Sequence, residues 1–495
     1  MKLHWLVLAI LVVAPAADAL NIATKGIRAR SSEEFSPETA WDLGIYGCDV
    51  TIAIFDEGVD DAHPHLDGKV AAGVDVTATG IVWNNVNDGN PQPILGTHGT
   101  PVAGLAVSHA GKPFFHAEDF PGYDEDDLVG MAPCAWMVDV QFNDILGAST
   151  SEFVAAFDWA IANKDNDWGD NDPTNDGIDI ITMSWSPLDG TDGSDVLSQA
   201  ANRAVEAGIV VLGSMGNSGP EYQPWGTPAA ADLSLGIANL WNERTIDRSD
   251  DVIRESSTIG PRPDDGDDNP YDELKPDVAT PGHGVIGPVA GNADGSEYAI
   301  AGCGEDSIAP VDVSLILSCT AGFSGTSAAT PMTAGVVALM LDANQNLTAA
   351  DIKEILHQTA IPHKDQTPSA PEINAVYNHV YGWGMTDAYG AVKMAMTWPG
   401  MELGADTDSD GVRNYRDAEP FNPAVKTIIA PAPEIKETPL PPAQDADGDG
   451  VTNDVDDDPL DPTVQSGGTT GESNDTPFIG IGCVLLGLAV VMRRR

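Results

Sequence analysis

The chain has 495 residues, of which 76 are acidic and 23 basic, so its formal net charge is −53. A charge this negative repels phosphate backbones and argues against any nucleic acid as a partner. Apolar residues make up 42% of the chain, which is enough to bury the core of one large domain with small appendages. Most of the carboxylates are therefore expected to form a solvated, salt-tolerant surface.

The N-terminus has the features of a secretory signal peptide. Lys2 supplies the positive charge, and Leu3 to Val13 form an apolar run broken only by His4. A small-residue cleavage site ends at Ala19. A membrane helix is the alternative, but the run is too short to span a bilayer. We expect residues 1–19 to be removed and the mature protein to be exported.

Short apolar runs then alternate with helical patterns along residues 20–398. Buried strands are expected at Val50–Phe55, Met137–Phe142, Ile178–Met183 and Ile209–Leu212. Helices are expected at Ser149–Ala162, Asp195–Ala207 and Met332–Leu341. The alternation predicts an α/β fold with a doubly wound, mostly parallel sheet that has helices on both faces.

Three short segments in this region carry candidate catalytic side chains. Asp56 lies at the end of a predicted strand in IAIFDEGV, where open α/β sheets place their active sites. His98 lies in GTHGTPVAG, whose glycines let the backbone pack closely around the ring. Ser327 lies in GTSAATP at the start of a helix, where free N–H groups stabilise negative charge.

Together these segments resemble the subtilase family, whose catalytic residues follow the chain order Asp, His, Ser. Three further segments strengthen the resemblance over roughly residues 38–395: Gly216-Asn217, KPDVATPG at 275–282 and YGWG at 381–384. The resemblance implies a subtilisin-like fold and a serine endopeptidase that needs no cofactor for catalysis. Protein or peptide substrates are the expected partners, and the sequence does not reveal the oligomeric state.

The resemblance also implies a role for each site residue. His98 is expected to take the proton of Ser327, and Asp56 to orient His98. The side-chain amide of Asn217 and the backbone N–H of Ser327 are expected to hold the oxyanion. Two segments match the family's substrate cleft, where a peptide pairs as an added strand. Their residues are Ser184, Trp185, Ser186, Ser214, Met215 and Gly216.

Two residues and the length of one segment depart from the usual family pattern. Glu57 replaces a small hydroxyl residue, and strand alternation predicts that it faces away from His98. The kexin-like branch of the family also has an acidic residue there. Ser186 replaces a glycine and is expected to narrow the cleft. The stretch between Ala19 and Asp56 is too short for the usual folded pro-domain.

Four cysteines outside the C-terminal tail form an even set, which suggests disulfides in an exported protein. In the subtilase fold, Cys48 and Cys134 precede neighbouring strands at the same end of the sheet, so we expect them to pair. Cys303 and Cys319 flank an insertion before the nucleophile, and we expect a second disulfide between them.

Composition changes near Pro399, and two Asp-rich repeats with a Pro-rich spacer occupy residues 404–463. Their acidic residues stand at positions 1, 3, 5 and 12 with Gly at position 6, which is typical of calcium loops. The expected ligands are Asp406, Asp408, Asp410 and Asp417, and then Asp445, Asp447, Asp449 and Asp456. The segment resembles thrombospondin type 3 repeats and predicts a structural Ca²⁺ role; an Asp-rich solvated linker is the alternative.

A linker at 466–477 leads to a C-terminal segment at 478–495. Phe478 to Met492 is uncharged and mostly apolar, and three arginines end the chain. The pattern predicts a transmembrane anchor or a sorting signal, and either places the protein at the cell envelope, on the outer surface. A catalytically inactive subtilase scaffold with calcium-binding adhesive repeats is the alternative to an active peptidase.

Overall fold

The computed structural model describes residues 18–61, 63, 65–83, 98–109, 128–142, 148–169, 172–186, 190–220, 226–267, 269–288 and 320–398. The predicted calcium repeats, linker and C-terminal segment lie outside these residues, as do Cys303 and Cys319. Within the described residues, no helix is both long and apolar enough to cross a membrane.

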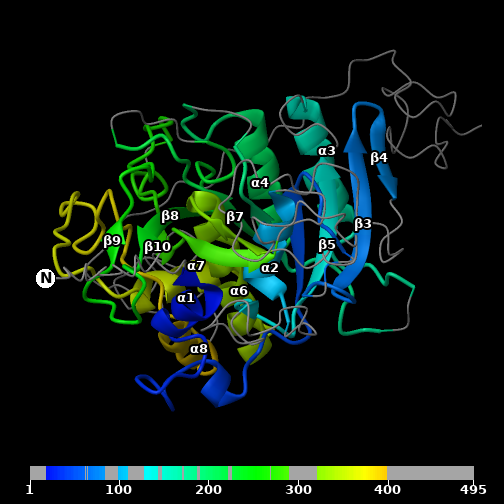
Figure 1. Ribbon diagram of the computed structural model, residues 1–495. Coiled ribbons are helices and arrows are strands. Elements are labelled where there is room, and N and C mark those ends of the chain that lie inside the picture. Colours follow the sequence, from blue (N-terminus) through cyan, green and yellow to red (C-terminus); the bar gives the residue numbers. More distant parts are fainter. Residues whose placement is uncertain are drawn as a thin grey trace, which may run out of the picture. The chain divides into compact units, whose positions relative to one another are not determined.

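Nine strands of the described chain form the central sheet (Figure 1). Its main path runs in the order β10-β8-β7-β6-β2-β5-β3-β4, and β9 pairs with β8. Pairing is parallel except at β3–β4 and β8–β9. The strands are β2 (Thr51–Asp56), β3 (Val70–Thr77), β4 (Gly80–Trp83), β5 (Trp136–Phe142), β6 (Ile180–Met183), β7 (Val210–Ser214), β8 (Leu235–Trp241), β9 (Val252–Ile253) and β10 (Val278–Pro281).

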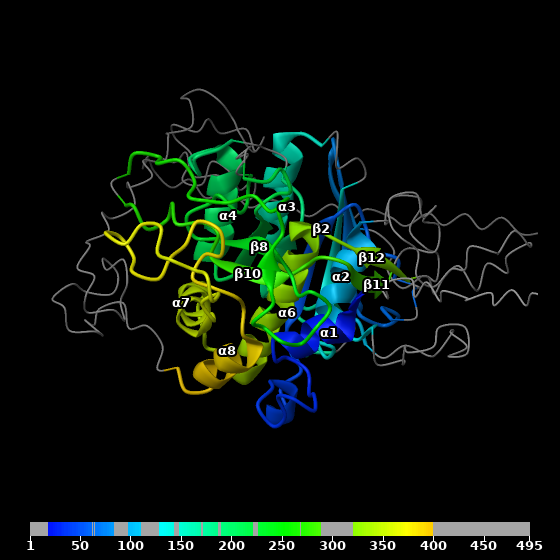
Figure 2. The same ribbon diagram turned by 60° about the vertical axis from the view of Figure 1, so that its left-hand side comes forward.

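Helices cover both faces of this sheet (Figure 1 and Figure 2). The described helices are α1 (Leu20–Gly26), the 3-10 helix η1 (Trp41–Leu43), α2 (Gly99–Val107), α3 (Thr150–Ala162), α4 (Val196–Glu206), α6 (Thr326–Ala343), α7 (Ala349–Thr359) and α8 (Ala388–Ala395). A smaller sheet joins β1 (Asp18–Ala19), β11 (Val285–Pro288) and β12 (Thr320–Phe323). The expected α/β fold with a mostly parallel sheet is therefore confirmed.

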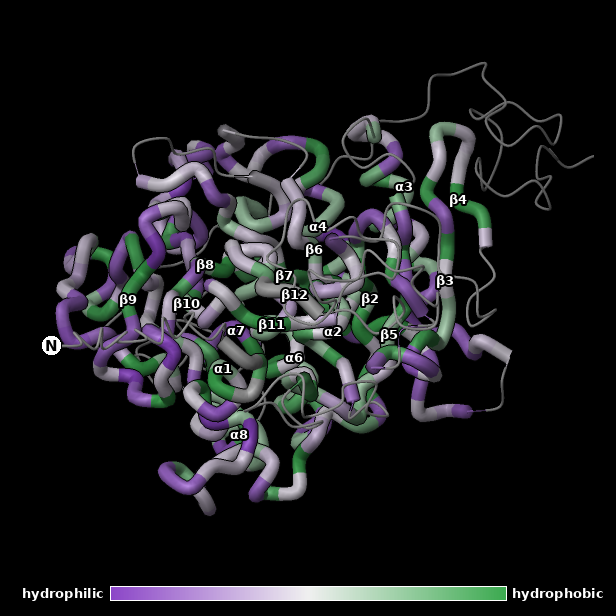
Figure 3. The backbone as a smooth tube through the Cα atoms, in the orientation of Figure 1, coloured by the Kyte–Doolittle hydropathy of each residue, from purple (hydrophilic) through white to green (hydrophobic). Residues whose placement is uncertain are grey.

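Strand β2 shows why a continuous apolar run suits this architecture. Ile52 and Ile54 pack into the core on the side of α2 and α6, whereas Ala53 and Phe55 pack into the core on the side of α3 and α4. Successive side chains of a strand point to opposite faces, so a strand covered on both sides must be apolar throughout. Figure 3 shows the hydrophobic segments gathered around β2 and β5 in the interior.

Strand β1 contains the last two residues of the predicted signal peptide. Asp18 and Ala19 pair in parallel with Val285 and Ile286 of β11. The next residue, Leu20, begins α1 and is fully buried. The segment that follows the predicted cleavage site is therefore part of the folded core.

One of the two predicted disulfides lies in the described residues. Cys48 and Cys134 are joined, with their Cα atoms 4.7 Å apart, and the bond links positions separated by 86 residues. Nearby, Asp342 of α6 accepts hydrogen bonds from the backbone N–H groups of Tyr46, Gly47 and Cys48. The turn before β2 is thus fixed both covalently and by hydrogen bonds.

Candidate active site

Asp56 and His98 are in direct contact at the carboxyl end of β2. Asp56 is the last residue of that strand and is almost fully buried. His98 precedes α2, and its Nδ1 atom lies 2.9 Å from each carboxylate oxygen of Asp56. Asp56 Oδ1 also accepts the N–H of Glu57 at 2.9 Å. This arrangement fixes the ring orientation and places Nε2 on the side of the imidazole that faces away from Asp56.

The expectation that Glu57 faces away from His98 is wrong. Glu57 Oε1 accepts the backbone N–H of His98 at 2.7 Å. Strand alternation does not apply here because β2 ends at Asp56. The Glu57 carboxylate instead lies at the N-terminus of α2, where the helix dipole favours negative charge. Two consecutive carboxylates therefore hold His98, one at its ring and one at its backbone.

Ser327 is the second residue of α6 and is buried. Its Oγ donates to the carbonyl of Ser184 at 3.1 Å, and Ser184 Oγ donates to the carbonyl of Ser327 at 3.0 Å. The Ser327 carbonyl can accept that bond because Pro331, four residues on, has no N–H to fill it. Pro331 thus links the nucleophile turn to the segment that follows β6.

Phe323 connects the same turn to His98. Its ring packs edge-on against the imidazole, with centroids 5.2 Å apart. Gly325 follows with φ 133°, a conformation that favours glycine, and its N–H donates to the carbonyl of Gly282 at 2.8 Å. These contacts place the start of α6 beside the Asp56–His98 pair.

Asn217 lies just after β7 on the other side of the nucleophile turn. Its Oδ1 accepts the N–H of Thr326 at 2.9 Å and the Thr326 hydroxyl at 3.2 Å. With the oxygen used in this way, the amide nitrogen is the free donor of the side chain. A Cβ atom at Gly325 would stand 3.1 Å from that nitrogen, so a larger residue there would crowd it.

The predicted cleft segments follow the ends of β6 and β7. Ser184, Ser214 and Met215 are buried, whereas Trp185, Ser186 and Gly216 are half-buried. The Gly216 carbonyl accepts the N–H of Thr258 at 3.0 Å, and the Gly216 N–H donates to the Thr326 hydroxyl at 3.2 Å. These bonds set the segment against the nucleophile turn.

The KPDV motif belongs to a buried charge network that its sequence alone does not reveal. Asp277 lies 3.2 Å from Lys275 Nζ, 3.3 Å from Lys353 Nζ and 2.9 Å from His357 Nε2. Burial acts to raise the pKa of Asp277, but the two lysines and the His357 hydrogen bond outweigh it and hold the pKa well below its usual range. Trp383 stacks flat on His357 at 3.6 Å. The motif therefore places a carboxylate whose charge is compensated in the interior of the fold.

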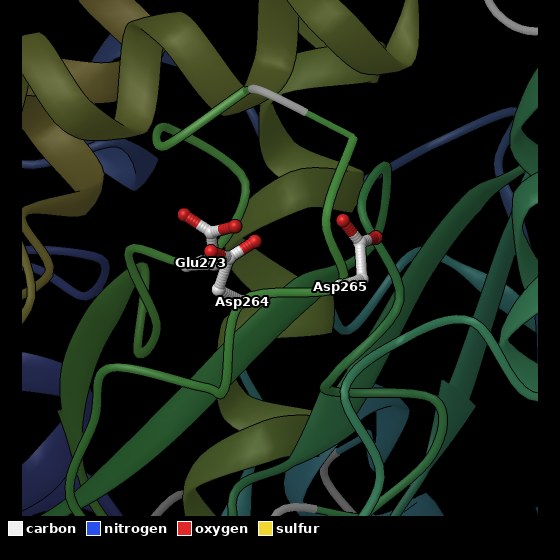
Figure 4. A group of neighbouring side chains, drawn as sticks. All are labelled: Asp264, Asp265 and Glu273. Carbon is white, nitrogen blue, oxygen red and sulfur yellow. The ribbon is translucent and has the colours of Figure 1, made fainter.

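The loop between β9 and β10 carries the acidic groups of the described chain that could hold a metal ion. One group is Asp264, Asp265 and Glu273, and the other is Asp267, Asp272 and Glu273; the ligand atoms of each group lie within 4.8 Å of one another. Figure 4 shows Asp264 and Glu273 side by side, with Asp265 further along the same loop. Burial and then the neighbouring Asp272 raise the pKa of Glu273 to about 8. No site was predicted in this loop from the sequence, although its high density of aspartates is visible there.

A buried arginine already supplies positive charge to this loop. Arg262 has no exposed side-chain surface and lies 2.8 Å from Asp232, 2.8 Å from Asp272 and 3.4 Å from Asp265. The loop is therefore held together by ion pairs to one guanidinium group. Burial alone would disfavour the charge of that group, and the surrounding carboxylates compensate for it.

Comparison with known proteins identifies relatives of the part of the chain that carries the candidate active site. Residues 47–384 match the profile of the Subtilase family. The serine protease AprX of Bacillus subtilis is 27% identical over 366 residues, which cover 70% of this chain and 67% of AprX. Endoprotease bli of Onchocerca volvulus is 28% identical over 75% of this chain, but only 46% of its own length is covered.

A solved structure shares the fold. Fervidolysin from Fervidobacterium pennivorans, described as a keratinolytic enzyme related to subtilisin, superimposes with a TM-score of 0.51. The match covers 74% of this chain and 45% of fervidolysin, with 20% sequence identity. At that identity the likeness supports the fold alone.

Proposed function

This chain belongs to the subtilase family of serine proteases, and on that premise we propose that it is an exported endopeptidase whose catalytic residues are Asp56, His98 and Ser327. The observation that carries the proposal is the paired contact of His98 Nδ1 with both oxygens of a buried Asp56, beside a serine at a helix N-terminus. A scaffold without activity has no need for this arrangement, which favours the enzyme over an inactive adhesive protein.

In the proposed reaction His98 acts first as base and then as acid. Nε2 takes the Ser327 proton as Oγ attacks the scissile carbonyl, and later gives it to the leaving amine. Without substrate, Ser327 Oγ donates to the Ser184 carbonyl. Rotation about the Ser327 side chain exchanges that bond for one to His98, because catalytic hydrogen bonds commonly tighten only when substrate binds.

The negative oxygen of the intermediate needs donors that are already oriented. We assign these to the Asn217 amide nitrogen and the Ser327 backbone N–H, at the N-terminus of α6. Losing one such donor typically costs about 3 kcal/mol of transition-state stabilisation. The residues Ser184–Ser186 and Ser214–Gly216 are proposed to bind the peptide on the acyl side of the cleaved bond.

Replacement of Ser327 tests the assignment. Ser327→Ala removes the nucleophile and is expected to lower kcat for casein hydrolysis by a factor of about 10³ or more. Circular dichroism of the variant should match wild type, because the substitution removes only one hydroxyl. Casein hydrolysis near the wild-type rate by the folded variant would refute the triad.

A structural role for calcium in residues 404–463 is a separate proposal. So many carboxylates repel one another without a cation, and the segment has little apolar surface to keep it compact. Isothermal calorimetry on the full chain is expected to detect millimolar-range calcium binding that Asp406→Ala plus Asp445→Ala removes. A control that deletes two exposed acids of the catalytic region, Glu206→Ala plus Glu372→Ala, should retain it. Equal binding by both double variants would contradict the proposal.

A further inference from the structure

Two basic side chains pack against Trp241 at the carboxyl ends of β8 and β10, and a third, Arg244, is close enough to His283 to influence its charge. The guanidinium carbon of Arg254 lies 5.5 Å from the centre of the Trp241 ring. His283 packs edge-on against the same indole at 5.6 Å. Burial lowers the pKa of His283, and the nearby charges of Arg254 and Arg244 lower it further. We call Arg244, Arg254 and His283 the basic cluster.

Arg254 differs from most arginines that the structure describes. Arg248 lies 2.9 Å from Asp251, and Arg262 lies 2.8 Å from Asp272. Arg254, by contrast, has no carboxylate partner within the described part of the chain, and its buried Nε has no hydrogen-bond partner there. In a chain of net charge −53, an arginine without an acidic neighbour is unusual, and a buried unsatisfied donor is costly unless a ligand fills it.

The basic cluster lies beside the nucleophile turn. His283 stands between Gly282, whose carbonyl accepts the N–H of Gly325 at 2.8 Å, and Gly284, whose N–H donates to Ser324 Oγ at 2.8 Å. Arg254 packs on Trp241, and Trp241 packs on His283. The two neighbours of His283 are hydrogen-bonded to Ser324 and Gly325, which directly precede Thr326 and Ser327.

The segment after Arg254 is joined to the oxyanion side as well. The N–H of Gly219 donates to the carbonyl of Ser256 at 2.8 Å, and the N–H of Thr258 donates to the carbonyl of Gly216 at 3.0 Å. The basic cluster is thus bracketed by the nucleophile turn and the segment that carries Asn217.

The direction of a bound peptide follows from the chemistry. The acyl half is assigned to the segments after β6 and β7, so the leaving half must continue past His98, which protonates the leaving amine. Phe323 packs against His98, and the next residue, Ser324, is the one bonded to Gly284. The leaving half therefore runs toward His283 and the rest of the basic cluster.

We propose that the basic cluster binds carboxylate side chains on the leaving-group side of the scissile bond, so that the enzyme prefers Asp or Glu just after the cleaved bond. The proposal rests on the proposed function and adds its substrate class. The arginine fork fits a carboxylate with two parallel hydrogen bonds. A local positive site also offsets the repulsion that an acidic peptide meets from the rest of this surface.

Matched quenched fluorescent peptides test the preference. They share one acyl half and carry Asp or Asn at each of the first three positions after the scissile bond. Wild type is expected to cleave the best Asp peptide with a kcat/KM about tenfold above that of its Asn counterpart. A ratio of this size corresponds to the free energy of about one hydrogen bond to a charged group. Arg254→Gln should bring the ratio close to one, and Arg254→Lys should keep part of it. Arg203→Gln removes the same charge from α4 and should leave both activity and ratio unchanged.

The outcomes separate the two proposals. A wild-type ratio near one, or a ratio that Arg254→Gln leaves intact, overturns the basic cluster as a carboxylate site. If wild type cleaves neither peptide, the proposed function fails. Peptide binding then tests whether the basic cluster is a carboxylate site. Fluorescence anisotropy with the Ser327→Ala chain should then show tighter binding of the Asp peptide, which Arg254→Gln added to that chain abolishes; equal binding of the Asp and Asn peptides would overturn the inference.

Discussion

Buried carboxylates in this protein differ in what surrounds them. Asp277 is enclosed by two lysines and a histidine, so its charge is compensated. Asp139 on β5 accepts only the Val59 N–H, at 3.3 Å, through one oxygen, and its other oxygen has no partner in the described chain. Burial raises the pKa of Asp139 well above its usual value, and neighbouring acids add to the effect. Such groups make the stability of the fold sensitive to pH.

Asp179, before β6, gives a test of this kind. Burial is the main reason that its pKa is raised to about 6, and the nearby charge of Asp165 acts in the same direction. The hydrogen bond from the Thr51 N–H at 2.8 Å and the charge of Lys164 act to lower the pKa. The folded state then holds the proton more tightly than the unfolded state, so stability falls as pH rises from about 4 to about 6. Asp179→Asn keeps an acceptor for Thr51 and removes the charge.

The expected gain of Asp179→Asn over wild type is about 2 kcal/mol above pH 7 and close to zero at pH 4. Urea unfolding at the two pH values measures it. A gain of equal size at both pH values would show that charge burial is not the cause.

Helix starts in this fold depend on single side chains. Asp195 caps α4: its Oδ1 accepts the N–H groups of Leu197 at 2.9 Å and Ser198 at 3.0 Å. Burial acts to raise the pKa of Asp195, but hydrogen bonds from Ser198, Thr191 and the backbone outweigh it and lower the pKa. The stabilisation is therefore present above the unfolded pKa, near 4, and is lost as pH falls below it.

Asp195→Ala is expected to lower the free energy of unfolding by about 1–2 kcal/mol at pH 7. Chemical denaturation followed by circular dichroism measures the loss. Glu206→Ala, at the other end of the same helix, removes an equal charge and is expected to cost nothing, because an acid is unfavourable at a helix C-terminus. Equal losses in the two variants would contradict the capping role.

Element by element, the sequence predicts four buried strands and the starts of α3 and α4 closely, but it misses the start of α6. The strands β2, β5, β6 and β7 lie within two residues of their predicted bounds, since a strand buried on both faces must be apolar throughout. Helix α6 was expected from Met332 but begins at Thr326, because Pro331 is accommodated inside it. That proline is tolerated because the carbonyl it leaves free accepts the Ser184 hydroxyl, a contact between distant segments that no local pattern contains.

Across the whole molecule, local motifs located the candidate catalytic residues, whereas their supporting contacts came only from the fold. The motifs around Asp56, His98 and Ser327 are each readable as short segments. The bond from His98 to Glu57, the network around Asp277 and the ion pair of Arg262 with Asp232 join segments that are separated in the chain. Periodicity and spacing describe neighbours in sequence, so they cannot reveal such pairs.

The central claim is that Ser327 is an activated nucleophile, and covalent labelling tests it most directly. A fluorophosphonate reacts with a serine whose proton is taken by an adjacent base. Mass spectrometry of the labelled native chain is expected to find the adduct on Ser327 alone, with labelling lost in His98→Ala and after heat denaturation. Native, folded protein that takes up no label at Ser327, or that labels equally with and without His98, would contradict the account.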